Sequence, residues 1–197
     1  MVSTNCMLII NKNNNEALIV DPGNEAKRIE GEIAKANCQP VAILLTHGHF
    51  DHIMAVDELR DKYDIPIYIH KDEAKLLGSS ILNHSAKYKM PYQTKADKLL
   101  DDNQKLSLAG IDIEVIHTPG HTSGSCCYYL PKENVLISGD TLFYGTVGRT
   151  DLDTSSGAAM RESIQRLLTT LPEEVEVFPG HSNSTTIGHE KRYNPFA

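Results

Sequence analysis

The chain has 197 residues, of which 40% are hydrophobic and 23% charged, and these fractions exclude a disordered or fibrous protein. Its formal net charge of -7 lacks the basic excess expected of a nucleic-acid-binding protein. The N-terminus has no basic n-region and only a short apolar run, so neither a signal peptide nor a membrane span is expected, and a cytoplasmic location follows.

The first half of the chain has a hydrophobic pattern that predicts strands alternating with helices. The expected elements are a hairpin of strands at 6–10 and 17–20, a helix capped by Asn24 and running to Ala36, a buried strand at 41–45, a helix around 53–59, a strand at 65–69 and a short helix at 71–77. The polar range 78–102 shows no clear period and is expected to form a surface excursion without chemistry.

The second half repeats this plan. Strands are expected at 111–116, 125–130 and 135–138, followed by a helix at 160–171 and a last strand at 175–178. The fold class is therefore α/β, with sheets inside and helices outside. The adjacent Cys126 and Cys127 should point to opposite faces of their strand, and the four cysteines, which include no CxxC pair, do not suggest a disulfide framework.

The motif THGHFDH, from Thr46 to His52, follows the apolar run 41–45 directly. Residues two apart in an extended turn share a side, so His47 and His49 can converge on one metal ion. Asp51 and His52 enter the next helix and address a different point. One short motif can thus serve two metal ions.

Three further residues lie in a similar setting, a Gly-containing turn near an apolar strand: His121 in HTPGHTSGS, Asp140 in LISGDTLF and His181 in VFPGHS. Loops converge at strand ends in α/β folds, and glycine lets the backbone approach an ion closely. With the first motif, these residues predict a metal centre.

The HxHxDH motif, followed by a single His, Asp and His in these contexts, resembles the metallo-β-lactamase superfamily, and within it the single-domain glyoxalase II-like (hydroxyacylglutathione hydrolase-like) group. The resemblance covers nearly the whole chain. It implies an αββα sandwich of two mixed sheets flanked by helices, formed by one domain over 1–197 without the C-terminal glutathione-binding helical domain of longer relatives. It also implies several residues of a first strand ahead of Met1.

The resemblance further implies which residues hold two divalent metal ions per chain. Zinc is the first expectation, and the same His/Asp set accepts iron or manganese. Site one would be formed by His47, His49 and His121, site two by Asp51, His52 and His181, with Asp140 bridging both. Two ions about 3.5–4 Å apart can share a hydroxide that attacks a carbonyl. The implied activity is hydrolysis of a small hydroxyacyl thioester, similar to S-lactoylglutathione, with Asp51 also expected to be catalytic.

Four other residues are candidates for supporting roles. Asp21, in a DPG turn, and His117, before Thr118-Pro119, are expected to orient metal ligands. Tyr144 and Arg149 belong to the segment FYGTVGRTD and are candidates for substrate binding, although Arg149 could instead pair with Asp151.

Other functions stay open at this point. The sequence GRTD and the HxHxDH motif also resemble those of persulfide dioxygenases. That resemblance implies one non-haem iron, held in this chain by His47, His121 and Asp140. A binding module without catalysis, a lactonase and a phosphodiesterase are further alternatives. The oligomeric state is not indicated by the sequence.

Overall fold

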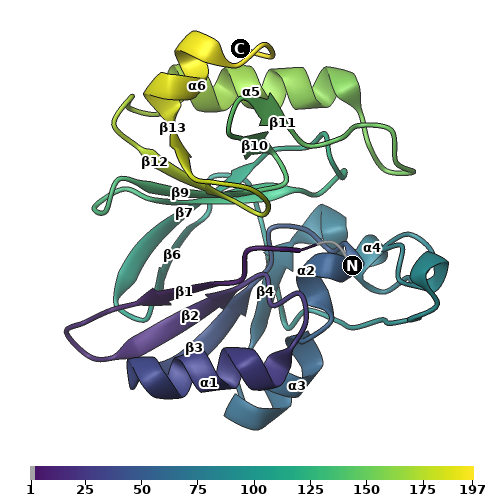
Figure 1. Ribbon diagram of the computed structural model, residues 1–197, viewed down its shortest axis with the longest axis vertical. Helices are drawn as coiled ribbons and strands as arrows, with labels where there is room; N and C mark the ends of the chain where they lie inside the picture. The colour runs from purple at the N-terminus through teal and green to yellow at the C-terminus, as the bar shows by residue number, and fades with distance from the viewer. Residues whose placement is uncertain (1–2) are drawn as a thin grey trace.

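Two β-sheets packed face to face form the centre of the protein, and helices cover the outer face of each sheet (Figure 1). This is a computed structural model that describes residues 3–197, so the expectation about Met1 lies outside the described residues. The layers confirm the predicted αββα sandwich of two mixed sheets.

The first sheet has five strands in the order β1-β2-β3-β4-β5, antiparallel between β1 and β2 and parallel thereafter. Its strands are β1 (Met7–Ile10), β2 (Glu16–Val20), β3 (Gln39–Leu44), β4 (Ile67–His70) and β5 (Lys98–Leu100). Helices α1 (Ala26–Ala36) and α3 (Val56–Tyr63) lie on its outer face. Parallel strands need crossover connections, and these helices provide them.

The second sheet has six strands in the order β13-β12-β9-β8-β7-β6, with β12 and β9 parallel and the other neighbours antiparallel. Its strands are β6 (Lys105–Leu108), β7 (Ile111–His117), β8 (Cys126–Leu130), β9 (Val135–Gly139), β12 (Glu176–Pro179) and β13 (Thr185–Thr186). Helices α5 (Gly157–Thr170) and α6 (Ile187–Tyr193) cover it.

Short elements occupy the connections between the layers. They are α2 (Phe50–Ile53), the 3-10 turns η1 (Lys71–Glu73) and η2 (Ala86–Tyr88), α4 (Ala74–Leu77), and the small hairpin of β10 (Leu142–Phe143) and β11 (Thr146–Val147). Most of them lie in loops at the edge of the sandwich where the candidate site is found.

Two helices of the structure differ from the sequence prediction, one in its capping residue and the other in its continuity. The cap of α1 is Glu25, in a left-handed conformation, and the Asn24 side chain accepts a hydrogen bond from the Glu25 N–H instead. The single helix expected around 53–59 is divided into α2 and α3. It is interrupted because Met54 and Ala55 donate their N–H groups to the carbonyls of the Asp21-Pro22-Gly23 turn.

Three clusters of apolar side chains hold the layers together. One lies between the sheets, a second between the first sheet and helices α1 and α3, and a third under α5. Cys126 belongs to the cluster between the sheets and Cys127 to the cluster under α5, which confirms that they point to opposite faces. All four cysteines are free.

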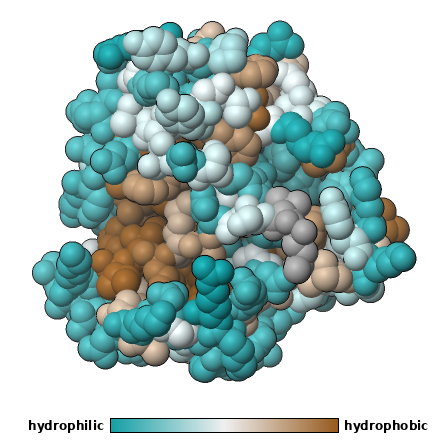
Figure 2. All heavy atoms as spheres, in the orientation of Figure 1, coloured by the Kyte–Doolittle hydropathy of each residue, from teal (hydrophilic) through white to brown (hydrophobic). Residues whose placement is uncertain are grey.

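Hydrophobic side chains reach the surface at the edge where β1 and β6 face each other (Figure 2). Met7, Ile9, Leu106 and Leu108 are only partly buried against the cluster between the sheets. Within residues 3–197, no helix combines the length and apolar character needed to cross a membrane.

A hydrogen bond between the two sheets fixes the start of the histidine motif. The buried Tyr128 hydroxyl on β8 donates to the Leu45 carbonyl at 2.8 Å, one residue before Thr46.

We expect Tyr128→Phe to lower the free energy of unfolding by about 1–2 kcal/mol, because a buried carbonyl loses its donor. Chemical denaturation measures this loss. Tyr129→Phe, at the next and half-buried position of β8, should change stability by less than about 0.5 kcal/mol.

Candidate metal centre

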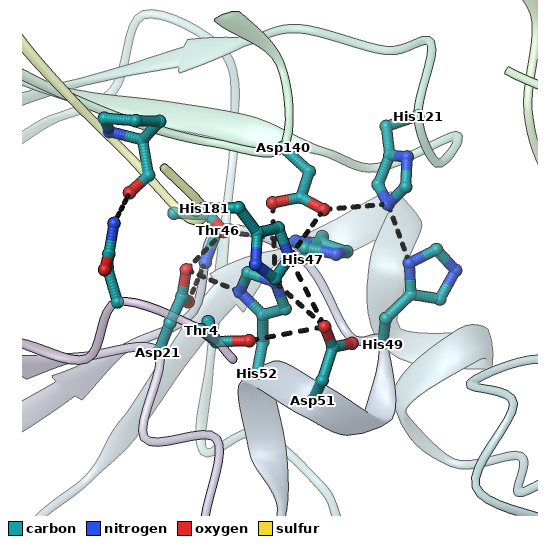
Figure 3. Close-up of polar contacts among 12 residues, drawn as sticks. Thr4, Asp21, Thr46, His47, His49, Asp51, His52, His121, Asp140 and His181 are labelled. Carbon is teal, nitrogen blue, oxygen red and sulfur yellow. Dashed lines mark hydrogen bonds and ion pairs between the residues drawn. The ribbon is translucent and has the colours of Figure 1, made fainter. Parts of the chain in front are cut away.

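Seven His and Asp side chains from four separate loops meet at one edge of the sandwich (Figure 3). The loop after β3 and the helix α2 supply His47, His49, Asp51 and His52; the loop after β7 supplies His121; and His181 and Asp140 follow β12 and β9. The sandwich therefore brings together all seven residues that the sequence motifs singled out.

These residues form three overlapping groups in which one nitrogen or oxygen atom per residue lies within 4.8 Å of the others. The groups are His47, His49 and His121; His47, His52 and Asp140; and Asp51, His52 and His181. The pattern separates the two halves of the HxHxDH motif, and Asp140 lies between them.

The histidine rings are oriented by hydrogen-bond partners behind them. The Nδ1 atoms of His121 and His181 face the carbonyls of Arg149 and Ser3, at 2.9 and 2.6 Å. A carbonyl accepts only from a protonated nitrogen, so both rings carry a proton on Nδ1. Their Nε2 atoms are left to point into the cluster.

Asp21 performs the same task for His52. Its Oδ2 lies 3.0 Å from His52 Nδ1 and 2.6 Å from the Thr46 hydroxyl, while its Oδ1 accepts from the Thr46 N–H at 2.8 Å. The turn at Asp21 thus joins the end of β2 to the histidine motif. Thr4 is a further orienting group, since its hydroxyl donates to Asp51 Oδ2 at 3.3 Å.

Asp140 lies at the centre of the cluster. Its Oδ1 is 3.4 Å from His52 Nε2, and its Oδ2 is 3.4 Å from the Nε2 atoms of both His121 and His181. Asp51 Oδ2 also lies 3.4 Å from His181 Nε2. Two carboxylates therefore face a shared set of ring nitrogens.

Burial and charge divide the histidines into two classes. Desolvation holds the pKa of His47 and His49 well below the usual range, so both imidazoles are neutral. Desolvation also lowers the pKa of His181, but Asp140 and Asp51 outweigh it and raise this pKa to about 10. For Asp140, burial alone would raise the pKa, yet the neighbouring His52 and His181 hold it well below its usual range.

The residues fit a divalent metal ion. Within residues 3–197, His47 Nε2, His52 Nε2 and Asp140 Oδ1 are buried and have no hydrogen-bond partner. Buried polar atoms are normally satisfied, and bound cations would satisfy these three. Neutral imidazole, as at His47 and His49, and ionised carboxylate, as at Asp140, are the forms that bind metals, whereas His181 would release a proton on binding.

The other residues singled out in the sequence lie farther from the cluster. Arg149 is exposed and forms a two-pronged ion pair with Asp151, at 2.7 Å for both contacts. Tyr144 is exposed and stacks on His189. His117 contacts the Ser123 carbonyl and stacks on His70, rather than touching one of the seven residues.

The sequence analysis missed several contributors, among them Thr4, described above, and also His84 and Ser3. His84 lies in the excursion to which no chemistry was assigned, yet its ring is centred 5.2 Å from that of His49. Ser3 acts through its backbone carbonyl, for which any residue type would serve. No sequence signal could have identified a carbonyl that meets His181 only in the folded chain.

Comparison with known proteins places this arrangement in a family context. The chain matches the profile of the metallo-beta-lactamase superfamily over residues 1–181. The probable metallo-hydrolase YqgX of Bacillus subtilis is 42% identical over 183 residues, covering 92% of this chain and 87% of the relative. The hydroxyacylglutathione hydrolase GloC of Haemophilus influenzae is 35% identical over 198 residues, covering 98% and 92%.

Several solved structures are also similar to this chain in both fold and sequence. BLEG-1 B3 metallo-beta-lactamase is similar with a TM-score of 0.93 and 42% identity, covering 98% of this chain and 93% of that chain. The di-iron-bound form of TTHA1623 has a TM-score of 0.87 and 34% identity, covering 98% and 95%. ETHE1 from Myxococcus xanthus has a TM-score of 0.81 and 28% identity, covering 98% and 79%.

The contacts of Asp21 generate a prediction about metal affinity. Asp21→Asn tolerates the left-handed backbone at this position (φ 48) but places an amide against His52 Nδ1 or Thr46. We expect one of two metal-binding steps to weaken by about 10- to 100-fold. Competition with a coloured chelator measures both steps. The control is Asp112→Asn. Asp112 lies on β7 and forms an ion pair with Lys132, so its replacement should leave both metal-binding steps unchanged.

Proposed function

Because the chain belongs to the metallo-beta-lactamase superfamily, we propose that it is a metal-dependent hydrolase of the glyoxalase II type, which cleaves a hydroxyacyl thioester. The observation that carries this proposal is the central position of Asp140 between the His47, His49, His121 group and the Asp51, His52, His181 group. A carboxylate between two sets of ligands suits a pair of metal ions.

In this proposal one divalent ion would be held by His47, His49 and His121, and the second by Asp51, His52 and His181. Asp140 would be available to both. Bound divalent ions polarise a carbonyl oxygen and lower the pKa of water. Zinc is proposed first; the di-iron form of TTHA1623 supports iron as an alternative occupant. The protein's own contribution is to hold the ligand atoms in place before the metal arrives.

The chain orients each part of this centre through groups already in position. The carbonyls of Arg149 and Ser3 fix the rings of His121 and His181, and Asp21 fixes that of His52. Asp51 is proposed as a catalytic residue in addition to its role as a ligand, because its carboxylate is 12% exposed and so borders the space a substrate would enter. Thr4 restrains that carboxylate.

A small-molecule substrate is supported by the surroundings of Asp51. A pocket of 610 Å³ reaches Asp51 and has a mixed lining of apolar side chains, among them Phe50 and Met54, and of polar and charged ones, among them Arg28 and Glu32. Pockets for small ligands are commonly of this size and mixed character. The name of the Haemophilus influenzae relative supports a hydroxyacyl thioester as the substrate class. We propose one domain over 1–197 as the catalytic unit.

A persulfide dioxygenase is the second candidate. Two observations are compatible with a single iron held by His47, His121 and Asp140. They are the sequence GRTD at 148–151 and the distance of 3.4 Å between His121 Nε2 and Asp140 Oδ2. The likeness to ETHE1 from Myxococcus xanthus keeps this candidate in view.

Metal content and turnover together test the proposal. We expect protein purified without chelator or histidine tag to contain close to two ions per chain and to hydrolyse S-lactoylglutathione. Chelation should abolish hydrolysis, and added zinc or iron should restore it, because the nucleophile depends on the metal. Hydrolysis by metal-free protein would refute the proposal. One iron per chain with oxygen uptake on glutathione persulfide would favour the dioxygenase.

Replacement of Asp140 tests the centre itself. Asp140→Asn keeps the size of the side chain but removes the charge between the two ligand groups, so thioester turnover should fall by more than about 100-fold. Steady-state kinetics at fixed metal concentration measures the loss. Asp61→Asn, an exposed acid on α3, is the matched control and should retain wild-type turnover. Equal turnover of the two variants would contradict the proposed role of Asp140.

A further inference from the structure

Glu73 is a fully buried acidic side chain outside the group of seven. It lies at the end of η1, between β4 and α4, and its exposed fraction is 0%. In the sequence it belongs to the stretch KDEAKLL, where an acid at the start of a helix has an ordinary explanation. The folded structure gives it a different environment.

The two carboxylate oxygens of Glu73 bind two separate loops. Oε1 accepts from the Gly48 N–H at 3.0 Å, and Oε2 accepts from the Gly124 N–H at 2.9 Å. Gly48 lies between His47 and His49, and Gly124 lies three residues after His121. One side chain therefore connects the two backbone segments that carry the His47, His49 and His121 group.

Steric contact reinforces these hydrogen bonds. A Cβ atom on Gly124 would lie 2.5 Å from both the backbone nitrogen and Oε2 of Glu73. A Cβ atom on Gly48 would lie 2.9 Å from Leu76 Cδ2 and 3.3 Å from the Leu77 nitrogen. The Gly124 loop thus packs directly against Glu73, and the Gly48 loop packs against the helix α4 that follows it.

This arrangement is costly for the protein. Desolvation raises the pKa of Glu73 to about 7, even though the N–H groups of Gly48 and Gly124 favour the charged form. A buried carboxylate between two N–H groups gives directional contacts that an apolar side chain of the same volume cannot provide. Its placement is explained if the separation of the two loops has to be held constant.

Asp21 provides an internal comparison. It contacts Thr46 and His52, and His52 belongs to the other group, with Asp51 and His181. Asp21, at the end of β2, thus supports the other group directly through His52. It reaches the group supported by Glu73 only indirectly, because the Thr46 hydroxyl that it holds also lies 3.2 Å from His47 Nδ1.

We propose that Glu73 is a positioning residue that holds His47, His49 and His121 at metal-binding separation by fastening the backbones of Gly48 and Gly124. This inference rests on the metal centre of the proposed function, but not on the identity of the substrate. It assigns Glu73 to one metal site only.

Glu73→Gln is the principal test. Glutamine has the same shape, but its amide group would face one of the two N–H donors, so one loop loses its acceptor. We expect one of two metal dissociation constants, measured by chelator competition without substrate, to rise by about 10- to 100-fold. The affected step should differ from the one weakened by Asp21→Asn, and the double variant should weaken both.

Cobalt loading gives a second readout. The visible absorption of cobalt bound in the weakened site should lose intensity or shift, because the three ligands no longer keep one geometry. Glu190→Gln is the matched control: Glu190 is also fully buried and accepts from a glycine N–H, that of Gly145, but it contacts neither loop held by Glu73. It should lower the thermal midpoint while leaving both metal constants and the cobalt spectrum unchanged.

Several outcomes would overturn the proposal. One is a Glu73→Gln variant that lowers only the thermal midpoint, as Glu190→Gln does, and another is a Glu73→Gln variant that weakens the same step as Asp21→Asn. Should Glu73→Gln not fold, Glu73→Asp serves instead, since it keeps the charge but is too short to reach both loops; unchanged constants in that variant would also overturn it. A wild-type chain that binds two ions but cleaves no thioester would refute the proposed function alone.

Discussion

The charge balance around Asp140 is the constraint on which this edge of the protein depends. Its carboxylate is 7% exposed and faces the ring nitrogens of three histidines at 3.4 Å. An isolated buried carboxylate would be expensive, so ring nitrogens or cations must surround it. The packing of two sheets makes this possible, because it brings the ends of β3, β9 and β12 to one edge. At this edge the interior of the sandwich is therefore polar and suited to cations, in contrast to the apolar clusters elsewhere.

The second feature of the centre is that its ligands are oriented by groups outside the set of seven candidate ligands. The carbonyl of Ser3 meets His181 across 178 positions of sequence, and that of Arg149 meets His121. Two buried carboxylates, Asp21 and Glu73, accept hydrogen bonds from the N–H groups of Thr46 and Gly48 in the histidine motif. Preorganisation of this kind lowers the cost of binding an ion, since the ligands do not have to be collected first.

Periodicity predicted the main strands and helices correctly because each has a long enough apolar face. The helix α5 and the strands β3, β7 and β9 were all expected close to their observed places. Short elements were missed because they have no such face. The strands β10, β11 and β13 have two residues each, and β5 shows only one buried side chain, so no repeat can be seen. The helix α6, capped by Thr186, was also missed.

By itself, the sequence determined the fold class and the set of seven candidate ligands, because HxHxDH and three Gly-flanked residues at strand ends are local patterns. The motif and the family resemblance also gave the division of those residues into two groups, and only the tertiary structure decided which other residues support them. Glu73 has the local pattern of a helix-start acid, yet it is buried between two loops. For Arg149 the sequence left substrate binding and pairing with Asp151 open, and the structure shows the pair. Burial and hydrogen-bond partners depend on segments far apart in the chain, and local pattern does not record them.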